Sequence, residues 1–193
     1  MQSPALIVLL GFSGSGKSTL GTRLLERRPS ACLLDADLIA VPGVANGYRV
    51  RSERDRYSIY AVMMKQAREA LTARHDVLWI QALTMEAAHH SHPPPAGRIG
   101  LVGLALEQRA ALAMIHLDPP LAVLQHRLAA RTRLPRSGGT WDQILERMRT
   151  AWEPVRHPHL RLSNTDGLDL DTADTYIEKC CQERIGFIPA TDA

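Results

Sequence analysis

The chain has 193 residues, of which 45% are hydrophobic and 22% are charged, with a formal net charge of +3. This length suits one ordinary α/β domain, and no window approaches the roughly 20 apolar residues that a membrane-spanning helix needs. The composition is typical of a soluble globular protein, and we expect no membrane partner.

The charged residues and cysteines favour a small anionic ligand in a reducing compartment. The basic residues are mostly arginines and are scattered among 20 acids, so they indicate anionic ligands only weakly and make nucleic acid an unfavoured partner. Cys32, Cys180 and Cys181 have neither a metal-ligand spacing nor the even number of a disulfide framework. We therefore expect a cytoplasmic protein.

Strand and helix patterns alternate along the whole chain. Residues 5–10 (ALIVLL) form a continuous apolar run, which is typical of a strand buried on both faces of a parallel sheet and argues against a signal peptide. The other predicted strands are 31–37, 76–83, 112–118 and 159–164, and the predicted helices are 18–28, 52–74, 101–111, 120–131, 141–152 and 171–184. This alternation predicts a single α/β domain over residues 1–193, a three-layer, doubly wound, parallel five-stranded sheet.

The loop after the first strand carries the most specific motif. Gly11, Gly16, Lys17 and Ser18 fit G-x-x-x-x-G-K-[ST], between a buried strand and a helix. Glycines let successive N–H groups point inward, and the helix start adds its positive dipole end. We expect Lys17 to reach the β and γ phosphates of a nucleoside triphosphate and Ser18 to bind Mg²⁺. The predicted nucleotide-binding residues of this loop are Gly11, Ser13, Gly14, Ser15, Gly16, Lys17, Ser18 and Thr19.

Two acids follow in the second strand. Asp35 and Asp37 are two residues apart, so on a strand their side chains would share one face, beside the triphosphate. The alternative interpretation for each is an ordinary turn or helix-capping aspartate.

The segments GFSGSGKST and LLDADLI resemble the small P-loop kinases that phosphorylate metabolite hydroxyls, such as shikimate, gluconate and adenylylsulfate kinases and chloramphenicol phosphotransferase. The resemblance implies a nucleoside-monophosphate-kinase-like fold with ATP and Mg²⁺ as cofactors. It also implies that Asp35 contacts the Mg²⁺ shell and that Asp37 is the general base for the acceptor hydroxyl. Many P-loop proteins carry an acid on the third strand, where this chain has only Gln81.

The same resemblance places an acceptor arm at about residues 38–75 and a basic lid at about 131–141. Arg49 and Arg54 are the predicted substrate contacts, although interleaved acids make a self-paired helix start an equal alternative. Arg131 and Arg133 of the lid are predicted to stabilise the transferring phosphoryl group; the alternative is an exposed basic loop. By position alone, Asn164 and Thr165 are predicted to contact the adenine.

We therefore expect an ATP-dependent phosphotransferase acting on a hydroxyl of a small metabolite or antibiotic. A nucleoside, nucleotide or polynucleotide 5′-hydroxyl kinase is the alternative enzyme, and a slowly hydrolysing or non-catalytic nucleotide-binding regulator is the alternative of another class. The loop histidines His89, His90 and His92 lack accompanying acids or cysteines, so we interpret them as exposed rather than metal-binding. The sequence leaves the acceptor and the oligomeric state open.

Overall fold

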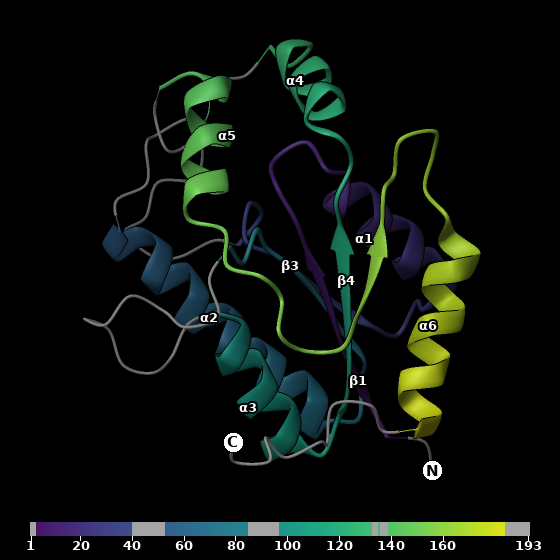
Figure 1. Cartoon of the computed structure of the whole chain (residues 1–193). Helices are drawn as coiled ribbons and strands as arrows, with labels where there is room; N and C mark the ends of the chain where they lie inside the picture. The colour runs from purple at the N-terminus through teal and green to yellow at the C-terminus, as the bar shows by residue number, and fades with distance from the viewer. Residues whose placement is uncertain (1–2, 40–52, 85–96, 133–134, 136–138, 184–193) are drawn as a thin grey trace, which may run out of the picture.

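The computed structural model describes residues 3–39, 53–84, 97–132, 135 and 139–183. Within this part, the chain forms a five-stranded parallel sheet in the order β2-β3-β1-β4-β5, with helices on both faces (Figure 1). The elements are β1 Ala5–Leu10, α1 Lys17–Arg27, β2 Cys32–Asp35, α2 Glu53–Thr72, β3 Val77–Ile80, α3 Arg98–Gln108, β4 Ala111–Leu117, α4 Leu121–Ala129, α5 Trp141–Thr150, β5 His159–Leu162 and α6 Leu170–Glu183.

The central strand explains the three layers. All six residues of β1 are buried, and Val8 pairs with Trp79 of β3 on one side and with Met114 of β4 on the other. Because side chains alternate along a strand, Leu6 and Val8 pack with α2 and α3. The intervening Ile7 and Leu9 pack with α1 and α6. The predicted doubly wound parallel sheet is therefore confirmed.

A separate, smaller cluster joins α4 and α5 to the loop after β1. Leu124 and Leu128 of α4 pack with Leu145 of α5, and Phe12 and Trp141 border them. Both helices stand beyond the carboxyl ends of the strands, at the top of the view in Figure 1. This cluster places two helices directly over the glycine-rich loop.

Among the predicted boundaries that differ from the structure, two have clear local reasons. The second strand ends at Asp35 rather than at residue 37, because Asp35 Oδ1 accepts a hydrogen bond from the Asp37 N–H at 2.9 Å and the chain turns. The third helix begins at Arg98, within the predicted loop 89–100, directly after Gly97 with its φ of 113°. The histidines of that loop lie outside the described residues.

No helix in the described part of the chain is long and apolar enough to cross a membrane.

Candidate active site at the glycine-rich loop

The loop between β1 and α1 has the backbone of an anion cradle. Gly11, Gly14 and Gly16 have φ values of 139°, 85° and 100°, a region that favours glycine. A Cβ at Gly11 would overlap the Leu117 carbonyl oxygen, and one at Gly16 would overlap the Asn164 amide. Helix α1 begins with no side-chain cap at Gly16 and no acid in its first turn, so its N-terminal N–H groups remain for a ligand.

Lys17 lies at the centre of the site. Its Nζ donates to the carbonyl oxygens of Gly11 and Phe12, both at 2.9 Å. Burial lowers the pKa of Lys17 to about 8; the charges of Asp35 and Asp37 oppose this shift, and that of Arg131 adds to it. All three charged side chains are therefore close enough to act on the Lys17 ammonium.

Ser18 and Asp35 are brought together as predicted. The Ser18 hydroxyl donates to Asp35 Oδ2 at 2.8 Å, from the first turn of α1 to the last residue of β2. Asp35 is buried, whereas Asp37 is exposed in the turn that follows the strand. The expectation that both acids share one face of a strand was wrong, since only Asp35 is on the strand.

These oxygens suit a hard cation. A serine hydroxyl and a carboxylate are ligands that Mg²⁺ accepts alongside phosphate oxygens and water. In the described residues no group of three or more His, Cys, Asp or Glu could hold a metal by itself. Ser18 and Asp35 therefore fit a Mg²⁺ that arrives with a nucleotide, rather than one held by the protein alone.

The loop after β5 braces the cradle. Asn164, with a φ of 44°, donates its side-chain amide to the Ser15 carbonyl oxygen at 2.6 Å. Its own carbonyl oxygen accepts from Arg127 Nη2 at 2.7 Å, and Thr165 is exposed beside it. The adenine contact of Asn164 and Thr165 stays a prediction, because the Asn164 amide is directed at the loop backbone in this structure. The Ser15 hydroxyl is fully buried inside the loop.

Arg127 is a site residue that the sequence reasoning missed. From α4 it joins the loop after β5 to the cradle, with Nη1 at 3.5 Å from the Gly14 carbonyl oxygen. The available signal was its position one helical turn before Arg131. Contacts to carbonyl oxygens of two distant loops, however, cannot be read from helical spacing.

The remaining predicted residues are only partly described. Arg131 places its guanidinium over the Trp141 ring, 5.3 Å from the centroid. Arg49 and Arg133, and the side chain of Arg54 in α2, lie outside the described residues. At the third-strand position, Gln81 Oε1 accepts a hydrogen bond from Trp79 Nε1 at 3.2 Å, so this amide has a structural partner.

The sequence profile of the AAA_33 family, described as an AAA domain, matches residues 6–154. This chain belongs to the AAA_33 family. No curated protein matches it in sequence. The matched residues of this AAA_33 member include the glycine-rich loop, the Ser18–Asp35 pair and the helices α4 and α5.

Solved structures show the fold that this AAA_33 member adopts. It is similar to a gluconokinase from Sinorhizobium meliloti 1021, with a TM-score of 0.62, 19% identity, and coverage of 95% of this chain and 97% of that one. It is also similar to the adenylylsulfate (APS) kinase CysC of Mycobacterium tuberculosis in complex with AMPPNP and APS (TM-score 0.58, 20% identity, coverage 92% and 98%). A third match is a tunicamycin resistance protein of Deinococcus radiodurans (TM-score 0.56, 13% identity, coverage 91% and 95%). The fold is that of the small P-loop kinases, as predicted.

Proposed function

We propose that this AAA_33 member is an ATP- and Mg²⁺-dependent kinase that transfers the γ-phosphoryl group to a hydroxyl of a small molecule. The observation that carries the proposal is the hydrogen bond from Ser18 to Asp35 beside the half-buried Lys17 ammonium, with Asp37 in the turn that follows Asp35. A simple phosphate-binding loop needs the glycines and the lysine but not this pair of acids.

Each residue has a role in the transfer. The amides of residues 11–19 bind the phosphate oxygens, and Lys17 turns from the carbonyl oxygens of Gly11 and Phe12 toward the terminal phosphates. Ser18 and Asp35 would hold Mg²⁺, which neutralises charge on the phosphates. Arg131, whose charge acts on Lys17, adds positive charge near the transferring group.

Asp37 acts as the base. The acceptor oxygen forms a bond to the γ-phosphorus while the bond between that phosphorus and the ADP oxygen breaks. The proton of the acceptor hydroxyl passes to the Asp37 carboxylate, which is exposed and held at the cradle through its N–H bond to Asp35. The APS kinase neighbour, solved with AMPPNP and APS, supports ATP as the donor and a small molecule as the acceptor.

The test is an acceptor screen followed by matched variants. The purified protein is incubated with labelled ATP and a panel of sugars, sugar acids, hydroxylated antibiotics, nucleosides and 5′-hydroxyl oligonucleotides. With the best acceptor, Asp37→Asn should lower kcat by about 10²- to 10⁴-fold while ATP affinity stays within a few-fold. As the control, Glu26→Gln changes an exposed acid of α1 that is not part of the site, and it should leave turnover unchanged.

The other outcomes decide against the proposal. Equal turnover by Asp37→Asn would remove Asp37 from the chemistry. Turnover of oligonucleotides alone, with steep salt dependence, would favour a polynucleotide kinase. Tight ATP binding without any phosphorylated product would favour a regulatory nucleotide-binding module.

A further inference from the structure

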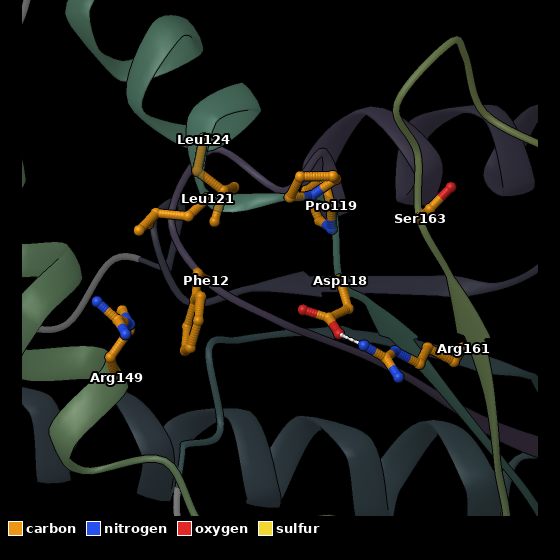
Figure 2. Close-up of a pocket in the computed structure, with 9 residues that line it drawn as sticks. Phe12, Asp118, Pro119, Leu121, Leu124, Arg149, Arg161 and Ser163 are labelled. Carbon is orange, nitrogen blue, oxygen red and sulfur yellow. Dashed lines mark ion pairs between the residues drawn. The ribbon is translucent and has the colours of Figure 1, made fainter.

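A cavity lies on the outer side of the glycine-rich loop. Its volume is about 310 Å³, the lower end of the range for small-molecule sites. Figure 2 shows its residues arranged around an open centre, with α4 above, α5 on one side and β5 on the other. Its lining residues are Phe12, Asp118, Pro119, Pro120, Leu121, Leu124, Arg149, Arg161 and Ser163.

This cavity is separate from the proposed transfer site. It opens beyond the ends of β4 and β5, whereas Asp35 ends β2, three strands away in the sheet order or about 14 Å at the usual strand spacing. Phe12 lies between the two sites. Its ring lines the cavity, and its carbonyl oxygen accepts the hydrogen bond from Lys17 on the cradle side.

The walls are apolar. The Phe12 ring, two prolines and the side chains of Leu121 and Leu124 enclose the space below the start of α4. Leu121, which lines the cavity, is 37% exposed. Such walls suit a ring-sized apolar body, because burying that body removes both surfaces from water.

The charges at the rim leave one net positive charge. Arg161 forms an ion pair with Asp118 on the β5 side of the cavity (Figure 2), so these two charges cancel. Among the residues that the structure describes, Arg149 of α5 forms an ion pair only with Glu146, at 3.3 Å. Both of these side chains are more than half exposed, which makes the pair weak. Arg149 can therefore turn its guanidinium toward an anion in the cavity.

We propose that this cavity binds a small carboxylate with an apolar, ring-sized body. The ring would stack against Phe12 and Leu121, and the carboxylate would accept two parallel hydrogen bonds from the Arg149 guanidinium. A single negative charge matches the net charge of the rim. A dianionic phosphate would place its second charge near the Asp118 carboxylate, so a carboxylate is preferred.

The experiment uses the full chain and three ring-bearing probes: phenylacetate, phenylacetamide and phenyl phosphate. Binding is measured by calorimetry and by NMR shifts of the labelled protein. Phenylacetate should bind at least 10-fold more tightly than the neutral amide and more tightly than phenyl phosphate. The same affinity should be found in the presence of saturating AMPPNP, because the two sites are distinct.

Variants on one helix provide the control. Arg149→Gln should weaken phenylacetate binding at least 10-fold, whereas Arg147→Gln, which changes another exposed arginine of α5 that does not line the cavity, should not. Leu121→Glu, at an exposed position, should abolish binding without lowering the thermal unfolding temperature. These results do not depend on kinase activity, so they stand or fall separately from the proposed function.

Several results would overturn the inference. They are no binding of phenylacetate at 10 mM, equal losses in the Arg149 and Arg147 variants, a preference for phenyl phosphate, and displacement of the probe by AMPPNP. The last would assign the probe to the nucleotide site instead.

Discussion

At the residue scale, Lys17 shows how partial burial affects a charged side chain before a ligand binds. Its ammonium is bonded to two neutral carbonyl oxygens, and burial lowers its pKa to about 8 despite two nearby acids. With a pKa of about 8, a substantial share of the nucleotide-free molecules holds a neutral amine near pH 8. A triphosphate brings several negative charges to the same place and favours the protonated form.

We predict that ATP binding takes up protons near pH 8. Because the pKa of Lys17 rises when the triphosphate binds, its uptake should approach about half a proton at pH 8 and should vanish by about pH 6.5, where the lysine is already protonated in both states. Calorimetry in buffers of different ionisation enthalpy measures it. Lys17→Met should lose the uptake, and an unchanged proton count in that variant would contradict the assignment.

Single residues differ in how far the sequence predicts them. The meeting of Ser18 with Asp35 could be expected, because the motif fixes the start of a helix and the apolar pattern fixes the adjacent strand. The position of Asp37 could not, since a side-chain oxygen of Asp35 ends the strand two residues early. Arg127 was missed because its partners are backbone carbonyl oxygens of loops 113 and 37 residues away.

At the element scale, α5 depends on its first turn. It has ten residues, a length at which an isolated helix is marginal. The Thr140 hydroxyl accepts from the Gln143 N–H at 3.3 Å, and Gln143 Oε1 accepts from the Thr140 N–H at 2.9 Å, a capping box. This start holds Leu145 against α4 and Phe12, so the cap supports the helix that stands over the glycine-rich loop.

We predict that Thr140→Ala lowers the free energy of unfolding of α5 by about 0.5–2 kcal/mol. Hydrogen exchange should quicken for amides of α5 and stay unchanged in α6, whose N-terminal contacts are separate. Thr140→Ser, which keeps the hydroxyl, should restore most of the protection. Exchange that quickens equally in both helices would show a global effect instead of a local cap.

At the scale of the whole molecule, one buried arginine joins three parts of the chain, and the tryptophan that it contacts joins two more. Arg98, at the start of α3, is fully buried and donates Nη2 to the carbonyl oxygens of Thr84, at 2.9 Å, and Glu153, at 2.6 Å. Its guanidinium also lies 5.3 Å from the centroid of the Trp152 ring. On that indole, His116 of β4 stacks at 4.7 Å and Phe12 makes an edge contact at 5.0 Å.

We predict that Arg98→Met lowers the free energy of unfolding by about 2–4 kcal/mol, because two charge-assisted hydrogen bonds and a cation–π contact are lost. Arg68→Met is the control. It removes a half-exposed ion pair with Glu107 between α2 and α3 and should cost no more than about 1 kcal/mol. Urea unfolding of both variants measures the difference, and equal losses would show that the buried contacts of Arg98 contribute little.

The fold as a whole was predictable in class but not in arrangement. Apolar runs alternating with helical patterns indicate parallel strands covered on both faces, and β1 confirms this. The order of the strands is set by how crossovers pack, which no local pattern records. The burial of Arg98 was equally hidden, since its partners are carbonyl oxygens of segments distant in sequence.

The contacts of Trp152 give the molecule a natural optical probe. The Trp152 indole contacts an imidazole, a guanidinium and the phenyl ring of the phosphate-binding loop, so its fluorescence changes when any of these neighbours moves. With Trp79 and Trp141 replaced by phenylalanine, the emission of the remaining indole would report rearrangements of that loop in real time, without an attached dye.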